Sequence, residues 1–277
     1  MIIRYDKSNV LRKELLQLSD CYPIDMQTLD DDAYQYYLAI DKNNGVGYGY
    51  WFVGGGVDNY GIFVFVREEH RRKHLGSELL HAMEKDLVKR GAKTVFCDHE
   101  FQKTSQEFMR TEGFSASVAY LMACHKIKIP VNPNQIRQAR KEDFSEIMHI
   151  WTSSYRNMLR SLGHPFSEED IEEASDESGI DDYLRTLSDR FVLETEAGIV
   201  GEGEISENHI GGVAVRIGQQ NKGYGTRLTA YLTHEILSRG YSEAFLYCEE
   251  GNPAKYVYEK VGYCPTKKIG TGIKMFR

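Results

Sequence analysis

The sequence repeats itself at long range, and this repeat limits the folds that the chain can adopt. A shift of 149 positions (209 − 60) aligns residues 60–114 with residues 209–263 without a gap, and the two stretches share 11 identities in 55 positions. The identities fall mainly on turns and on apolar positions, such as Gly76 with Gly225. A period near 150 is too long for a solenoid, so it indicates two copies of one domain. The length of 277 residues agrees with two domains, each large enough for its own core.

Both copies have the same pattern of elements. Each begins with a short β-type run and a helical stretch, continues with a three-stranded meander and a glycine-bearing turn that opens a helix, and ends with a strand, a helix and a final strand. In the first copy, Asn43-Asn44-Gly45 is a strong hairpin signal. This order predicts a mixed α/β fold. In the second copy we expect strands at 191–194, 199–204, 209–217 and 243–248, and helices at 226–239 and 253–261.

A linker is predicted at Ile129–Gln135, because this segment holds two prolines and two asparagines. We therefore expect domains at 1–130 and 131–277. The first β-type runs, at Ile3 and Ile136, are only 133 residues apart, so the second copy carries about 16 extra residues (149 − 133) in its early helical region. This region includes an acidic stretch at 167–182. We expect a solvated helix face there; the alternative is an entrance for a cationic substrate.

Composition excludes several classes of protein. The balance of 34 basic and 41 acidic residues gives a net charge of −7, the wrong sign for nonspecific binding to nucleic acid. No apolar run approaches the roughly 18–20 residues that span a bilayer. The N-terminal segment lacks the apolar core of a signal peptide. The five cysteines are odd in number and form no C-x-x-C, so we expect neither disulfides nor a metal site. We expect a cytoplasmic protein, whose oligomeric state the sequence does not indicate.

The turn after the third meander strand of the second copy predicts an anion site. A strand, a glycine-bearing turn and a helix N-terminus follow one another, so orphan backbone N–H groups and the positive end of the helix dipole meet at one place. No G-x-x-x-x-G-K-[ST] or G-x-G-x-x-G pattern occurs, so this is neither a Walker loop nor a dinucleotide fingerprint. The turn predicts a pyrophosphate site made by Gln220, Asn221, Lys222, Gly223, Tyr224, Gly225 and Thr226.

Two motifs together resemble the GNAT superfamily of N-acetyltransferases. The first is Gln/Arg-x-x-Gly-x-Gly/Ala after a strand, which the Gln220–Gly225 segment matches. The second is an asparagine, then a helix carrying a tyrosine, then glycine and an aromatic residue, which the segment from Asn252 to Tyr263 matches. The resemblance covers nearly the whole chain twice. It implies two tandem GNAT-like acyl-CoA N-acyltransferase domains, with acetyl-CoA as the expected co-substrate.

The resemblance also implies roles for individual residues of the second copy. A splayed strand at Val213, Ala214 and Val215 would bond the pantetheine arm, and Asn252 would contact the CoA. Tyr258 would protonate the departing thiolate, since a phenol is protonated at neutral pH. The implied function is transfer of an acetyl group to a primary amine of a small molecule. The alternatives are a protein or peptide acetyltransferase and an acyl-CoA sensor without turnover.

The proton acceptor is less sharply defined. Glu202 and Glu204 alternate on a strand and so share one face, and His209 and Glu249 lie near where the family often places a base. We take Glu204 as the preferred candidate. In the first copy, His74 replaces the first glycine of the loop, and Met109 stands where the tyrosine is expected. A thioether cannot protonate a thiolate, so we expect the first copy to be non-catalytic.

Overall fold

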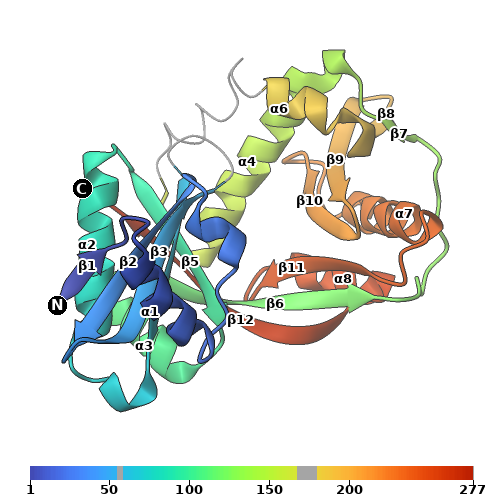
Figure 1. Ribbon diagram of the computed structural model, residues 1–277. Coiled ribbons are helices and arrows are strands. Elements are labelled where there is room, and N and C mark those ends of the chain that lie inside the picture. Colours follow the sequence, from blue (N-terminus) through green and yellow to red (C-terminus); the bar gives the residue numbers. More distant parts are fainter. Residues whose placement is uncertain (55–58, 167–179, 277) are drawn as a thin grey trace. The chain divides into compact units, whose positions relative to one another are not determined.

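The computed structural model of the chain describes residues 1–54, 59–166 and 180–276 (Figure 1). It divides into two compact units. The first unit comprises Met1–Ala116 and Gly270–Arg277, and the second comprises Ser117–Ile269. The predicted boundary after residue 130 separates the two copies of the sequence repeat, and it stays a prediction. The compact units differ from it, because the strand after Ala116 belongs to the second unit and the last strand ends in the first.

The first unit is a sheet with helices on both faces. Its strand order is β1-β2-β3-β4-β5, followed by the C-terminal part of β12, and β4 pairs with β5 in parallel. The helix α2 packs against the strands on one face and α1 against β3. The elements are β1 (Ile2–Arg4), α1 (Asn9–Ser19), the 3₁₀ turn Met26–Leu29, β2 (Tyr34–Asp41), β3 (Asn44–Val53), β4 (Asn59–Val66), the 3₁₀ turn Glu68–His70, α2 (Leu75–Lys89), β5 (Thr94–Glu100) and α3 (Lys103–Thr111).

The second unit repeats this plan. Its strand order is the N-terminal part of β12, then β6-β11-β10-β9-β8-β7, and β10 pairs with β11 in parallel. The elements are β6 (Ser115–Cys124), β7 (Ile136–Gln138), the 3₁₀ turn Lys141–Asp143, α4 (Phe144–Leu162), α6 (Ile180–Arg185), the 3₁₀ turn Leu187–Asp189, β8 (Arg190–Thr195), β9 (Gly198–Ser206), β10 (His209–Val215), α7 (Tyr224–Ser238), β11 (Ala244–Glu249), α8 (Ala254–Val261) and β12 (Cys264–Met275).

The structure confirms the mixed α/β fold and the repeat. The bounds of α2 and α7 differ by 149 residues at both ends, which is the offset of the sequence repeat. The first hairpin turns tightly, with positive φ at Lys42 and Asn43, one residue earlier than the predicted Asn43-Asn44-Gly45. Most of the acidic stretch 167–182 lies outside the described residues. Among the described residues, no helix is both long and apolar enough to cross a bilayer.

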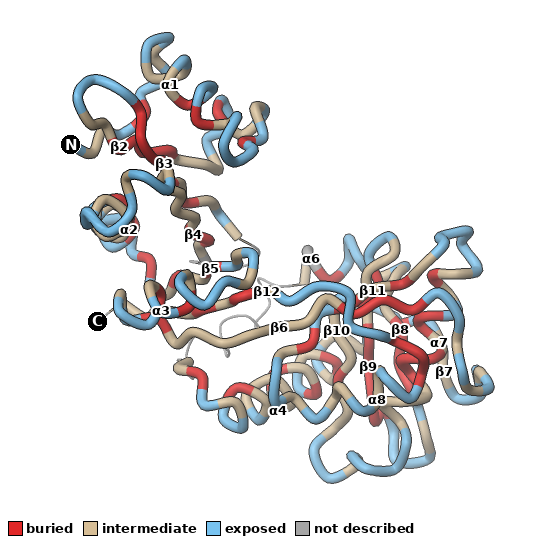
Figure 2. The backbone as a smooth tube through the Cα atoms, turned by 90° about the horizontal axis from the view of Figure 1, so that it is seen from below, coloured by how far each residue is buried: buried red, intermediate tan, exposed pale blue. Residues whose placement is uncertain are grey.

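The sheet of the second unit has an apolar core on each side. On one side α7 and α8 bury Leu232, Ile236 and Val261 against the strands. On the other side α4 buries Ile147 and Ile150. Figure 2 shows the central strands as buried and the outer sides of the helices as exposed. Because helices cover both faces of the sheet, the side chain of each strand residue points either toward α7 or toward α4.

The last strand completes the sheet of the first unit. The backbone N–H of Phe276 donates to the Lys93 carbonyl oxygen at 2.8 Å, and Lys274 forms a hydrogen-bonded ion pair of 2.6 Å with Glu84. Gly270 lies directly against two side chains: a Cβ there would be 2.3 Å from Nε2 of His99 and 2.4 Å from Nε2 of Gln106. The strand therefore fits at this place only with glycine.

This contact yields a stability prediction. Gly270→Ala should lower the free energy of unfolding by about 1–3 kcal/mol, since a methyl group must displace two packed side chains. Chemical denaturation measures the difference. Lys267→Ala, on the exposed part of the same strand, is the control and should change little. A Gly270→Ala protein as stable as the parent would contradict the described packing of β12.

Candidate functional site

The parallel strands β10 and β11 separate soon after they begin. Their only registered pair is His209 with Phe245, and the Phe245 N–H donates to the carbonyl oxygen of Asn208 at 2.9 Å. Beyond this pair, β10 continues to Val215 along β9 alone. One edge of β10 thus offers backbone groups to an extended ligand, which could bind as an additional strand.

The pairing of β10 with β9 shows which backbone groups face this edge. The N–H of Arg216 donates to the Val200 carbonyl oxygen at 2.9 Å, so Arg216 points toward β9. Antiparallel pairing alternates, so the backbone of Ala214 also points toward β9, and those of Val213 and Val215 point toward the open edge. The Val215 carbonyl oxygen already accepts from Ser154 Oγ at 3.0 Å. Val213 therefore supplies the N–H and C=O pair open to a ligand.

The loop after β10 has the geometry of an anion cradle. Gly223 is the N-cap residue of α7 with φ +84°, and no side chain caps the first turn of this helix. The N–H groups at the start of α7 thus lack intrahelical partners and point at one place. Gln220 folds back, because its Nε2 donates to the Val215 carbonyl oxygen at 3.2 Å. The Nζ of Lys222 donates to Gln219 Oε1 at 2.7 Å, which keeps its charge on the loop.

Tyr258 lies on α8, the helix that follows β11. Its ring packs edge to face on Tyr263, with ring centroids 6.2 Å apart, and its hydroxyl has no hydrogen-bond partner among the described residues. Burial raises the pKa of Tyr258 above its ordinary value, and the nearby Cys248 thiol raises it further. The phenol therefore stays protonated through the physiological range, as a proton donor must. Asn252 lies two residues before the start of this helix, where its Oδ1 accepts from the Ala254 N–H at 2.9 Å.

The two glutamates of β9 lie in different surroundings. Glu204 is ion-paired with Arg190 of β8, and Gly211 makes room for it in a β-bulge: a Cβ at Gly211 would be 2.8 Å from Glu204 Oε1. Glu202 is only 2 % exposed and has no such partner. His209 stacks on Phe245 with centroids 4.8 Å apart, and burial lowers the pKa of its imidazole.

A pairing that the sequence did not predict lies at the end of β11. Glu249 is hydrogen-bonded through Oε1 to Nε2 of His164, which follows α4 and is buried. Burial and the Glu249 charge raise the pKa of Tyr155, which stacks on Trp151 with centroids 4.9 Å apart. These residues are 85 positions or more from Glu249 in sequence, so no local motif could have revealed the group.

The loop of the first unit has nearly the same backbone as that of the second. His74 is the N-cap residue of α2 with φ +61°, the left-handed conformation that Gly223 adopts. Nε of Arg71 donates to the Val66 carbonyl oxygen at 3.0 Å, as Gln220 does to Val215. Replacing glycine by histidine has therefore not changed the fold of this loop. Met109, by contrast, is buried in the apolar core, where it offers no proton.

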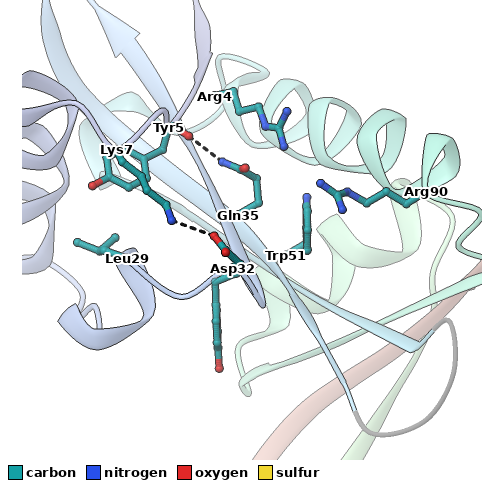
Figure 3. Close-up of a pocket in the computed structure, with 9 residues that line it drawn as sticks. Arg4, Tyr5, Lys7, Leu29, Asp32, Gln35, Trp51 and Arg90 are labelled. Atoms are coloured by element: carbon teal, nitrogen blue, oxygen red, sulfur yellow. Dashed lines mark hydrogen bonds and ion pairs between the residues drawn. The ribbon is translucent and has the colours of Figure 1, made fainter.

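The structure also contains a cavity of about 300 Å³ in the first unit (Figure 3), away from the predicted site residues. Arg4 and Arg90 both face Asp86 at 3.6 Å, and Lys7 is paired with Asp32 at 2.9 Å. Its charges are thus largely compensated within the protein. We interpret it as an internal polar network of the scaffold.

Comparisons with known families agree with the fold and the loops. The model described as "Acetyltransferase (GNAT) family" matches residues 8–114, and the model described as "FR47-like protein" matches residues 204–269. The chain belongs to the GNAT superfamily of N-acetyltransferases, whose members generally use acyl-CoA co-substrates. The match to residues 8–114 lies in the copy that departs from the motif at His74 and Met109. A comparison with curated proteins found no match.

Solved structures share the fold at low sequence identity. A GCN5-related N-acetyltransferase from Sphaerobacter thermophilus is 16% identical over 100% of this chain and 96% of that chain, with a TM-score of 0.62. A tandem GNAT protein from the clavulanic acid biosynthesis pathway is 12% identical over 99% and 98%, with a TM-score of 0.57. A fungal GCN5-related glucosamine N-acetyltransferase region is 12% identical over 99% of this chain and 38% of that chain, with a TM-score of 0.67.

The shared loop conformation can be tested by exchange. Gly223→His gives the second loop the residue of the first, and it should fold with a free energy of unfolding lower by about 1–2 kcal/mol, the cost of a left-handed non-glycine residue. His74→Gly should relieve this strain in the first loop and raise the stability. Denaturant titration of both variants measures the two shifts. An unfolded Gly223→His protein would show that the loops are not equivalent.

Proposed function

We propose that the protein transfers an acetyl group from acetyl-CoA to a primary amine of a small molecule, and that the active site lies in the second unit. The observation that carries this proposal is the presence of three features in that unit. These are the open edge of β10, the uncapped N-terminus of α7 behind Gly223, and the protonated phenol of Tyr258. The first unit has the edge and the loop, but it has Met109 in place of the phenol.

The chain supplies groups for each part of acetyl-CoA. The backbone at Val213 bonds the pantetheine arm, and the N–H groups from Gly223 to Thr226 hold the pyrophosphate. Asn252 contacts the CoA near the start of α8. Tyr258 gives its proton to the sulfur as the C–S bond breaks. The loop thereby fixes the donor and leaves the thioester near Tyr258, so that orientation contributes to the rate.

Carboxylates of the second unit suit a cationic acceptor. Glu204 was preferred from the sequence as the proton acceptor and remains our candidate for drawing the ammonium group of the acceptor to the sheet. Its carboxylate is already ion-paired with Arg190 of β8. The Glu249–His164 pair adds a second carboxylate at the end of β11.

Binding of acetyl-CoA tests the location of the site. Calorimetry should show that the intact chain binds acetyl-CoA and that Gly223→Glu loses one equivalent, because the new carboxylate repels the pyrophosphate in the loop. His74→Glu is the matched control in the first loop. If Gly223→Glu binds as tightly as the parent, the second loop is not the site. Two equivalents in the parent would show that the first unit also holds acetyl-CoA.

Replacing Tyr258 distinguishes an enzyme from a sensor. Tyr258→Phe should lower kcat by about 10²–10⁴-fold and leave the affinity for acetyl-CoA nearly unchanged, since only the proton donor is lost. The assay follows release of CoA with a panel of polyamines, amino sugars and arylalkylamines. Tyr256→Phe, at an exposed position of the same helix, serves as the control. Binding without turnover in the parent would favour an acyl-CoA sensor.

A further inference from the structure

The register of the strand pairs shows which residues of the two units are equivalent. Val66 pairs with Gly47 in the first unit, and its equivalent Val215 (66 + 149) pairs with Gly201 in the second. Moving along the strands from these pairs gives the residues that lie side by side on the face opposite α2 and α7. They are Tyr48 with Phe65 and Tyr50 with Phe63 in the first unit, and Glu202 with Ala214 and Glu204 with Gly212 in the second.

In the first unit, aromatic rings fill this face. The ring centroids of Tyr50 and Phe63 are 5.2 Å apart, those of Tyr48 and Phe65 are 5.6 Å apart, and those of Tyr48 and Phe63 are 5.7 Å apart. Tyr48 is fully buried. These ring contacts leave no space for a ligand on this face of β3 and β4.

In the second unit, the same four positions hold two small residues and two carboxylates. Among the described residues, no atom would lie within 4 Å of a Cβ at Gly212, so these residues leave open the position that Phe63 fills in the first unit. Ala214 adds only a methyl group. The open space lies on β10, the strand whose other edge faces the separation from β11, and Glu204 and Glu202 lie next to it on β9.

The two carboxylates differ in their partners. Glu204 is neutralised by Arg190. The residue Glu202 is 2 % exposed, and its carboxyl group makes no hydrogen bond or ion pair with the described residues. Burial raises the pKa of Glu202 to about 8, the Glu204 charge acts in the same direction, and Arg190 opposes both. A buried carboxyl without a donor costs free energy that an apolar residue would not, so it marks a functional position.

We propose that Glu202 accepts the proton of the acceptor amine in the second unit, and that Tyr48 at the equivalent position is one reason why the first unit has no acceptor site. This assignment rests on the proposed function. Glu202 is thereby the proton acceptor, whereas Glu204, which is ion-paired with Arg190 and lies beside Gly212, holds the ammonium group in the open space there.

The step balances with groups on the chain. The ammonium group transfers one proton to the ionised carboxylate of Glu202, and the neutral nitrogen attacks the thioester carbonyl carbon. The C–N bond forms, the C–S bond breaks with its electron pair on sulfur, and Tyr258 protonates the thiolate. The nitrogen of the new amide gives up its second proton, which replaces the one that Tyr258 donated to sulfur, and Glu202 returns the first proton to solvent.

The groups that face Glu202 account for its titration. Arg190 of β8 and Glu204 of β9 carry charge, and Tyr183 of α6 is protonated, because burial raises its pKa to about 12. The helix α4 and the strand β10 cover this side with Ile147, Ile150 and Ala214, which are apolar. Within the part of the chain that the structure describes, the charges that act on the carboxyl group of Glu202 are therefore those of Arg190 and Glu204.

Glu202→Gln tests the assignment, with acetyl-CoA as donor and the best amine of the panel as acceptor. In the parent, kcat/KM should rise with pH through an apparent pKa near 8. The variant should lose this ionisation and about 10²–10⁴-fold in kcat/KM at the plateau, with unchanged affinity for acetyl-CoA. Glu196→Gln, in the exposed turn between β8 and β9, is the control and should keep the parent profile.

The pH dependence of unfolding gives a readout that needs no acceptor. A carboxyl whose pKa is higher in the folded than in the unfolded state loses stability as pH rises between the two values. As the pH is raised from 5 to 9, the unfolding midpoint of the parent should therefore decrease relative to that of Glu202→Gln. If the midpoints of parent and variant change with pH in the same way, or if the variant is active with the parent pH profile, the assignment of Glu202 is wrong and the proposed function is not affected. A parent that acetylates no amine would instead refute the proposed function.

Discussion

The structure of the second unit depends on the close approach of α7 to β9, which glycine makes possible. A Cβ at Gly201 would be 2.7 Å from a methyl carbon of Leu228, and one at Gly203 would be 2.6 Å from a methyl carbon of Leu232. Glycines at alternate positions therefore fix which face of β9 meets the helix. Because side chains alternate along a strand, the residue between the two glycines must point to the other face. This residue is Glu202.

The same constraint operates in the first unit with a different outcome. Gly49 lies against Met83 of α2, where a Cβ would be 2.8 Å from the Cε atom, and the residues on either side are Tyr48 and Tyr50. Aromatic pairs contribute about 0.5–1.5 kcal/mol each beyond the area they bury, whereas a buried carboxyl without a donor is unfavourable. On this face the first unit thus gains stability from aromatic packing, whereas the second retains an unfavourable buried carboxyl group. The difference supports a division between a scaffold unit and a reactive unit.

The sequence predicted those parts of the structure that local patterns determine. The repeat offset defined α2 and α7, and the glycine turn before Tyr224 defined the loop, because turn residues and helix periodicity act over a few positions. The family motifs placed Tyr258 on the correct helix. His74 adopts the left-handed conformation that glycine has in the second loop, which the sequence did not indicate, and the expectation that the first copy is non-catalytic stays a prediction.

Features that depend on contacts between distant residues could not be predicted. Arg190 meets Glu204 only because β8 pairs with β9 in a register set by a bulge, and His164 reaches Glu249 only after α4 has crossed the sheet. The chain passes from the first unit to the second after Ala116 and returns to the first at Gly270. These crossings leave no local signal, because the sequences of β6 and β12 are those of ordinary strands. Glu204 was preferred over Glu202 for the same reason: its ion pair and the burial of its neighbour appear only in three dimensions.

The path of β12, which starts in the second unit and ends in the first, connects the proposed acid to the unit that has Met109 in place of tyrosine. The strand β12 begins directly after α8, the helix that carries Tyr258, and ends in the core of the first unit. There Gly270 fits against His99 and Gln106, and Lys274 pairs with Glu84. The segment after the proposed acid is therefore anchored by contacts in the first unit. Removing the first unit would leave the last part of β12 without these contacts, so α8 and the first unit are linked through the covalent chain.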